Sequence, residues 1–328
     1  MDTHTRYCLR TVGISSLLHF LVDGLCVCCL YLLAESHQLT HIVAAFMTYN
    51  VLAFLTQPLT GWYVDRVERK HWVLLASILL LTLAVLAAAL MTNIPSWRDS
   101  SVCLLVVASL LGMGNSLFHV WGGKQVVLKT DNDIRALGVF VSTGAFGLSV
   151  GVVFHSWPLL LGFLLAVSVL ALAYMNLDMA TDNMGGHVVD HGTTVSFSRL
   201  AVWLAMAALV AFVLFRSFVG QSFSSGMGKT SAIILTLGAV SMVGKMAGGW
   251  LVKAMGLLRA LLFVLLATLS CLVFRTSHPV ILMVGLFMIN CTMPITLYLA
   301  NVVMRGREGL AFGLLAAALM PGYLLAFL

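Results

Sequence analysis

Charged residues are scarce in this sequence. Of its 328 residues only 9% are Asp, Glu, Lys or Arg, whereas a soluble domain carries about 25%. So few charges cannot cover a surface that faces water, and 61% of the residues are hydrophobic. Together with a mean hydropathy of +1.03, this composition excludes an ordinary soluble domain. It predicts an all-α polytopic membrane protein surrounded by the lipid bilayer.

The signatures of several other protein classes are also absent. No H-E-x-x-H or P-loop pattern occurs, and the G-x-S-x-G match at 147–151 falls inside a predicted span and not at a strand-to-helix turn, which argues against an enzyme. The seven cysteines form neither a disulfide framework nor a paired C-x-x-C zinc pattern, so no cofactor and no resident metal are expected. The basic residues behind the net charge of +6 lie in short loops between spans, so we expect no nucleic-acid partner. We also expect the protein to be a monomer.

Long apolar runs dominate what is present. A helix needs about 20 largely apolar residues to cross the hydrocarbon core. The run from Thr11 to Leu33 is too long for the apolar region of a signal peptide, and it contains His19 and Asp23. We therefore interpret it as the first span. Eleven spans are predicted, at 10–33, 40–62, 71–91, 102–127, 136–155, 157–176, 199–222, 231–252, 257–274, 280–303 and 309–328.

The basic residues predict how these spans are oriented, because cytoplasmic loops carry an excess of Lys and Arg. If the N-terminus is cytoplasmic, the inner side receives Arg6, Arg10, Arg66, Arg69, Lys70, Lys124, Lys129, Arg135, Arg199, Lys253, Arg259, Arg305 and Arg307. The outer side receives only Arg98, Lys229 and Arg275. The N-terminus is therefore predicted to lie in the cytoplasm, and the membrane is expected to be a bacterial inner (plasma) membrane.

The longest loop predicts the domain boundaries. Residues 178–198 are polar, include two adjacent glycines and join the sixth span to the seventh, which is typical of a linker on the cytoplasmic side. It separates a six-helix bundle at 1–177 from a second bundle at 199–328, in which five helices are present. His187 and His191 lie four residues apart in this linker and could bind a metal, although a solvated linker is the simpler interpretation.

The two bundles carry an internal repeat. Residues 61–70 read GWYVDRVERK, and residues 249–258 read GWLVKAMGLL at an offset of 188. Both stretches are predicted at the inner end of the second span of their half. Six spans thus correspond to the next five, as parallel repeats related about the membrane normal.

A second echo of the repeat has an offset of 175. Asn115 corresponds to Asn290, and Gly138 corresponds to Gly313. At this offset the counterpart of the sixth span would begin near position 332. We expect either a truncated chain or an eleven-span variant with its C-terminus outside.

The stretch 61–70 resembles the loop signature G-x-x-x-D-R-x-G-R-[RK] of the major facilitator superfamily. The matching residues are Gly61, Asp65, Arg66, Arg69 and Lys70, and Glu68 stands in place of the family's glycine. The second copy has Lys253 and Ala254 for the acid–base pair. The resemblance implies a secondary transporter with a central cavity between two bundles, which rock to expose that cavity alternately.

The signature also suggests a conformational latch made of Gly61, Asp65, Arg66, Arg69 and Lys70. Gly61 lets two helices approach closely, and the Asp65 carboxylate would favour the positive N-terminal end of a neighbouring helix. The alternative is a simple topology anchor of positive charges.

At subfamily level, residues 112–123 and 140–151 are similar to the fosmidomycin-resistance-like drug exporters. Those relatives carry proline after the histidine of their G-x-G-x-x-x-F-H segment, where Val120 stands here. The similarity implies proton-coupled export, that is, an efflux antiporter.

Ionisable groups inside spans are functional candidates, because each costs about 2.5–3.5 kcal/mol on insertion scales. His19 and Asp23 lie four residues apart on the first span and share one helical face with Ser15 and Cys26. Asp23 is predicted as a proton-coupling carboxylate, with His19 or His119 as its relay partner. The alternative is a structural His–Asp pair that holds helices together.

Arg216 and Lys245 are the cations that topology explains least. Lys245 corresponds to Gln57 in the first repeat, and Asn115 shares a helical face with His119. We predict that Arg216, Lys245, Asn115 and Gln57 bind a small, anionic substrate. Internal ion pairing of the cations is the alternative, and Lys124 is expected only to snorkel towards the membrane surface.

Two other functions remain open at this level. His19, Asp23 and Cys26 could carry a divalent metal across the membrane instead of a proton, and the protein could be a transport-inactive membrane sensor. The leading hypothesis is proton-coupled export of a small molecule by alternating access.

Overall fold

The computed structural model describes residues 3–67, 70–182, 198–274 and 278–326, and all statements below refer to these residues. They form helices without a single strand. The first half of the chain contains α1 (Thr3–Ala34), α2 (Leu39–Asn50), the π-helix η1 (Val51–Leu55), α3 (Gln57–Val64), α4 (Lys70–Asn93), α5 (Pro95–Arg98), α6 (Ser101–Lys129), α7 (Ile134–Val153) and α8 (Trp157–Asp182). The second half contains α9 (Arg199–Ser225), α10 (Ser231–Met255), α11 (Leu257–Val273), α12 (Pro279–Val303), α13 (Glu308–Ala317) and α14 (Leu319–Leu325).

The predicted all-α polytopic fold with eleven spans is confirmed. Among the described residues, ten helical stretches are long and apolar enough to cross a membrane, and the 17-residue α11 is a shorter apolar helix. Each corresponds to one predicted span. α8 continues to Asp182, past the predicted boundary at 177, and the rest of the predicted linker, with His187 and His191, lies outside the described residues.

Polar caps explain where several helices begin. The hydroxyls of Ser100, Ser198 and Thr230 accept hydrogen bonds from the backbone N–H three residues later, at the starts of α6, α9 and α10. Asp133 caps α7 by accepting a hydrogen bond from the N–H of Arg135, two residues later. These side chains satisfy N–H groups that the first turn of a helix leaves without a partner.

Two spans are interrupted, and proline is the cause in each. Pro58 has no N–H for the carbonyl of Phe54, and the π-helix η1 precedes it in the second span. Pro321 likewise cannot bond to the carbonyl of Ala317, where α13 ends and α14 takes over. The hydropathy pattern predicts the length of these spans, but it does not show the breaks.

Apolar side chains cover the outside of the bundle. On α8, Leu161, Leu165, Val169 and Leu172 form one stripe with exposed fractions of 55–67%. Repeats of three and four residues place them on one helical face. A face of this kind is stable against lipid, as expected for a membrane span.

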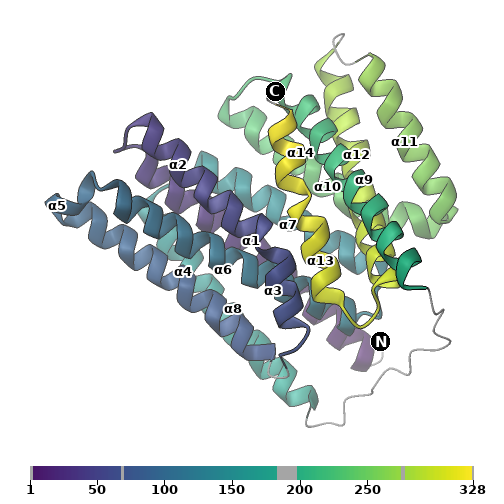
Figure 1. Ribbon diagram of the computed structural model, residues 1–328, viewed down its shortest axis with the longest axis horizontal. Coiled ribbons are helices and arrows are strands. Elements are labelled where there is room, and N and C mark those ends of the chain that lie inside the picture. Colours follow the sequence, from purple (N-terminus) through teal and green to yellow (C-terminus); the bar gives the residue numbers. More distant parts are fainter. Residues whose placement is uncertain (1–2, 68–69, 183–197, 275–277, 327–328) are drawn as a thin grey trace.

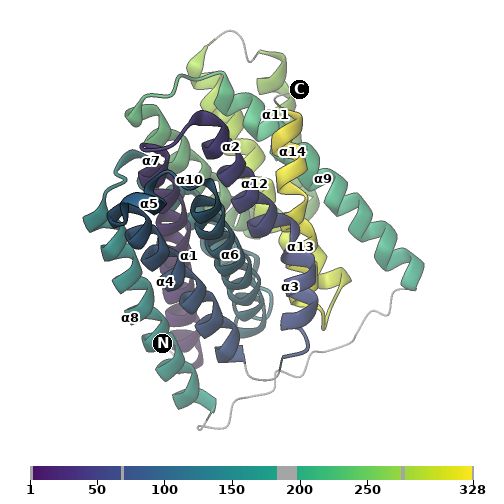
Figure 2. The same ribbon diagram turned by 60° about the vertical axis from the view of Figure 1, so that its left-hand side comes forward.

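The helices form two groups that meet along α7. α1 to α8 lie on one side and α9 to α14 on the other, and α7 packs against both α1 and α10 (Figure 1). α3 packs against α13 at the same interface (Figure 2). We call the end of the bundle where α3 ends and α13 begins the Asp65 end. The fifth span thus meets the eighth, and the second span meets the eleventh.

The contacts between the halves repeat with the two offsets found in the sequence. Gly61 packs against the backbone of Gly309, and Gly249 packs against the carbonyl of Ile134. A Cβ atom at either glycine would collide with that backbone. Position 249 is 61 shifted by 188, and 309 is 134 shifted by 175. The same holds for Gly313 against the Gln57 carbonyl and Gly138 against the Lys245 carbonyl. Small residues permit this close helix contact.

Candidate functional site

A buried polar cluster lies in the first half, between α1, α6 and α7. The Oδ1 atom of Asp23 accepts hydrogen bonds from His119 Nε2 at 2.9 Å and from Asn115 Nδ2 at 2.9 Å. His19 Nε2 lies 3.3 Å from the other oxygen, Oδ2. The side chains of Asp23, His19 and His119 are only 6–11% exposed. The three residues predicted for proton coupling therefore form one cluster, although 96 positions separate Asp23 from His119.

The backbone decides where the protons of this cluster lie. His19 Nδ1 is 2.7 Å from the carbonyl oxygen of Phe140, and because a carbonyl only accepts, Nδ1 must carry a hydrogen. A neutral His19 would then turn the lone pair of Nε2 towards the lone pairs of Asp23. A second proton on His19, or one on Asp23, converts this repulsion into a hydrogen bond. The geometry thus provides a place for one additional proton between His19 Nε2 and Asp23 Oδ2.

The same three side chains could also hold a metal ion. One ligand atom from each of His19, Asp23 and His119 lies within 4.8 Å of the others. The bond from His19 Nδ1 to a backbone carbonyl is the orientation that ligating histidines usually have. Cys26, predicted as a third ligand in the metal hypothesis, lies outside this group, and its sulfur is 3.8 Å from Asn115 Nδ2.

Gly144 of α7 closes the cluster on one side. A Cβ atom at this position would collide with Asp23 Oδ2 and His19 Nε2, so only glycine leaves room for the pair. The next residue, Ala145, lines the cavity described below. One helix, α7, thus forms the wall between the cluster and the cavity.

A cavity of about 340 Å³ lies between the halves, lined by α7, α9, α10, α12 and α14. Arg216 and Lys245, predicted on separate spans, both face it, and so do Asn290 and Met293 of α12. Among the described residues that line it there is no Asp or Glu. The lining reaches Tyr323 near the end of α14, so the cavity extends away from the Asp65 end.

Neither cation forms an ion pair with a carboxylate within the described parts of the chain. Arg216 is 6% exposed, its Nη1 contacts the sulfur of Met293, and its Nε–H has no acceptor. The Lys245 ammonium forms no hydrogen bond or ion pair with a described residue. Thioether sulfur is a weak acceptor, and an isolated buried cation is costly. An anion in the cavity would satisfy both groups.

At the Asp65 end, one carboxylate joins the two halves. The Asp65 oxygens accept hydrogen bonds from the backbone N–H groups of Gly309 and Leu310, each at 2.9 Å. These are the first turn of α13, where a negative charge is favoured by the helix dipole. Lys124 Nζ lies 3.2 Å from Asp65 Oδ1 and also donates to the Val64 carbonyl. Lys124, expected only to snorkel, is therefore a partner of Asp65.

The remaining predicted residues lie apart from these contacts. Arg66 donates to the Trp62 carbonyl at 2.8 Å and stacks over the Trp62 ring, so it stays within its own half. Gln57 is fully buried and donates to the Ala53 carbonyl; neither it nor Asn115 lines the cavity. Lys70 begins α4, and Arg69 lies outside the described residues.

Comparison with known proteins decides the family. The sequence model of the Major Facilitator Superfamily matches residues 12–327. The chain belongs to the major facilitator superfamily. Members of this superfamily are secondary transporters and not enzymes, which confirms the predicted class, whereas substrate and coupling are not determined by membership. No curated protein matches the sequence.

Solved structures share the major facilitator fold at low sequence identity. The human organic anion transporter MFSD10 has a TM-score of 0.70 and 15% identity, over 99% of this chain and 93% of its own. The E. coli fucose:proton symporter has a TM-score of 0.64 and 12% identity, over 98% of this chain and 90% of its own. A bacterial homologue of the iron transporter ferroportin, in an outward-facing state, has a TM-score of 0.63 and 14% identity, over 100% of this chain and 91% of its own. Identities this low show the fold alone.

Sequence reasoning missed several groups of the site. The Phe140 carbonyl fixes a proton on His19, yet a backbone atom has no sequence signal of its own. Gly144 lies in the glycine-rich stretch of the fifth span, and such a stretch predicts close packing and not space for a charged pair. Met293 and Asn290 line the cavity. Asn290 is the repeat counterpart of Asn115, and Met293 precedes Pro294 inside a span, so the sequence held a signal for each.

Proposed function

We propose that this major facilitator protein carries a small organic anion across the membrane through the cavity lined by Arg216 and Lys245. The observation that supports it is the charge of that cavity: two cations, no described acid, and one guanidinium N–H without an acceptor. A volume of about 340 Å³ is at the small end of the range for ligand sites. Apolar neighbours such as Ile289 and Leu286 favour an anion with an apolar body.

We further propose that protons drive this transport through Asp23, His19 and His119. The cluster has room for one extra proton between His19 Nε2 and Asp23 Oδ2, and α7 separates it from the cavity by one helix. A change of charge in the cluster would therefore act on the wall of the substrate cavity. Together with the resemblance to fosmidomycin-resistance-like exporters, this supports export from the cytoplasm of a bacterium, with the N-terminus inside.

The anion proposal is tested by transport into proteoliposomes under an imposed pH gradient. The probes are radiolabelled monocarboxylates and phosphonates, each beside a neutral amide or ester of the same size. We expect anions to be transported and neutral analogues not. Arg216→Gln and Lys245→Met should raise KM about tenfold each, which corresponds to the loss of about 1.4 kcal/mol of binding. Equal transport of the neutral analogues, or unchanged KM in both variants, would sink the proposal.

Divalent-metal transport remains the second candidate, because three ligand atoms of the cluster lie within 4.8 Å of one another. It predicts that Zn²⁺, Mn²⁺ or Fe²⁺ raises the melting temperature of the purified protein, and that Asp23→Ala abolishes this increase. Absence of any metal effect removes this candidate and leaves proton coupling. A transport-inactive sensor would bind an anion without moving any of the probes.

A further inference from the structure

The correspondence between the two halves extends to the charged residues at the Asp65 end, except that a lysine stands in the second half where the first has an aspartate. The repeat offsets place Lys253 at the position of Asp65, and Arg135 at the position of Leu310. In the first contact, Asp65 binds the N–H of Leu310 in the other half. In the second contact, a cation occupies the position of the acid. Replacement of Asp by Lys suggests simple degeneration of the repeat, but the surroundings of Lys253 indicate otherwise.

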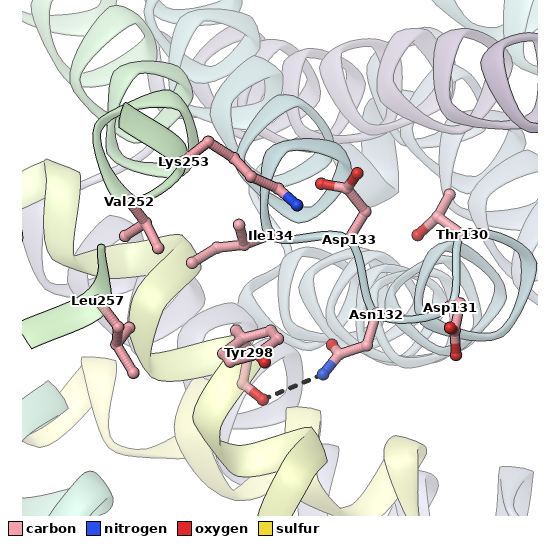
Figure 3. Close-up of a pocket in the computed structure, with 9 residues that line it drawn as sticks. All are labelled: Thr130, Asp131, Asn132, Asp133, Ile134, Val252, Lys253, Leu257 and Tyr298. Atoms are coloured by element: carbon pink, nitrogen blue, oxygen red, sulfur yellow. Dashed lines mark hydrogen bonds between the residues drawn. The ribbon is translucent and has the colours of Figure 1, made fainter. Parts of the chain in front are cut away.

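In the second contact the carboxylate belongs to the N-cap of α7 itself, Asp133, and not to the other half. Asp133 accepts a hydrogen bond from the backbone N–H of Arg135 at 2.8 Å, and its Oδ2 binds Arg135 Nη2 at 2.6 Å. Partial burial by itself would raise the pKa of Asp133, but the hydrogen bonds and the charge of Arg135, with a smaller contribution from the charge of Lys253, outweigh burial and lower it. Asp133 is thus a carboxylate. Lys253 extends from α10 towards it across a crevice of about 430 Å³ (Figure 3).

The turn before Asp133 makes a direct bond to the other half. Asp131 and Asn132 have φ values of +48° and +56°, in the left-handed region that Asp and Asn tolerate better than most residues. This backbone directs the Asn132 side chain to α12, where Nδ2 donates to the carbonyl of Tyr298 at 3.2 Å (Figure 3). The same crevice is lined by Asn132, Tyr298, Asp133 and Lys253, so residues of both halves face one another here.

We propose that Lys253, Asp133 and Asn132 form a second clasp between the halves, in which acid and cation have exchanged sides relative to the Asp65 contact. The N-terminus of α7 receives its carboxylate from its own cap, so an acid at position 253 would face another acid. A lysine there attracts it instead. Because Lys253 is exposed and the Asp133 side chain is 26% exposed, the attraction is screened and weak, which suits a contact that opens in every transport cycle.

α7 connects the clasp to the polar cluster and to the cavity. α7 begins at this turn and continues to Gly144 and Ala145, which contact the polar cluster and the cavity. Release of the first turn of α7 would free the helix that lies between them. Lys253, Asp133 and Asn132 are therefore positioning residues, since none of them touches the cavity of the proposed substrate.

Hydrogen–deuterium exchange of the purified full-length protein in nanodiscs tests this proposal without a substrate. The variants are Lys253→Met, Asp133→Asn, which keeps an oxygen for the helix cap, and the double variant. Exposed ion pairs contribute about 0.2–1 kcal/mol, so each single variant should speed exchange in peptides covering 130–138 and 296–304 by up to about fivefold. Asp133→Asn also loses its ion pair with Arg135, so the double variant should match Asp133→Asn alone, because Lys253→Met then has no pair left to remove.

Controls keep the outcome decisive. Arg259→Met removes an exposed cation from the start of α11, near Lys253 in the sequence, and should leave exchange unchanged. Lys253→Arg keeps the charge and should retain the slow exchange, whereas Lys253→Glu should speed it beyond Lys253→Met. Multiplicative effects of the two single variants, or equal exchange in all of them, would overturn the clasp. Failure of anion transport would leave these results as they are, so the two proposals are tested separately.

Discussion

At the scale of single residues, Gly144 shows how strictly the polar cluster is packed. A methyl group there would collide with both Asp23 and His19, whereas a methyl group at Gly162 of α8 would meet nothing within 4 Å. We expect Gly144→Ala to lower the melting temperature and to reduce transport at least about tenfold, because overpacking costs about 1–3 kcal/mol. Gly162→Ala should be neutral or stabilising by up to about 1 kcal/mol. Thermal melting and proteoliposome uptake of both variants measure this; similar values would contradict it.

Asp23 carries the second prediction at this scale. Asp23→Asn keeps a group that can accept from His119 and Asn115 but removes the charge that holds a proton near His19. We expect uptake driven by a pH gradient to fall at least about tenfold, a barrier change of about 1.4 kcal/mol, while exchange of substrate without a gradient persists. Counterflow and gradient-driven uptake, measured on the same vesicles, separate the two. Gradient-driven transport with unchanged pH dependence would show that Asp23 does not couple protons.

At the scale of elements, the contact between Asp65 and α13 holds two helices of different halves. Loss of a capping carboxylate costs about 0.5–2 kcal/mol. Asp65→Ala should therefore speed amide exchange in the first turn of α13 by about two- to thirtyfold, and Asp65→Asn should do so less. Arg66→Ala is the matched control, because Arg66 stays on its own Trp62. If Arg66→Ala has the same effect as Asp65→Ala, the contact is not specific to the carboxylate.

The scale of the whole molecule concerns the direction in which the cavity opens. Its lining reaches Tyr323, remote from the Asp65 end, where the backbones of the two halves meet at Gly61 and Gly309. With the seven native cysteines replaced, Ser241→Cys in the cavity should react with an impermeant thiol reagent from the side opposite the N-terminus. Adding Asp65→Ala should lower this labelling and raise labelling from the other side. If Asp65→Ala leaves the labelling unchanged, the Asp65 end and the open side of the cavity are not coupled.

Part of the site followed from the sequence alone because its members share one helix or one repeat. His19 and Asp23 lie four residues apart on one face, and Asp65 belongs to a recognisable loop pattern. The meeting of Asp23 with His119, and of Asp65 with Lys124 and α13, depends on how helices from distant parts of the chain pack side by side. The roles of these residues in coupling and latching stay predictions.

The sequence by itself determined the class of this protein, its eleven spans and the two offsets of its repeat. It could do so because span length and the distribution of charge are set by the bilayer, which acts on each segment separately. Only the tertiary structure decided which spans touch, that Arg216 and Lys245 face one cavity, and that Lys253 faces Asp133. Apolar residues that face lipid resemble those that face another helix, so lateral packing is fixed by shape and by a few polar contacts that become visible only when the helices are brought together.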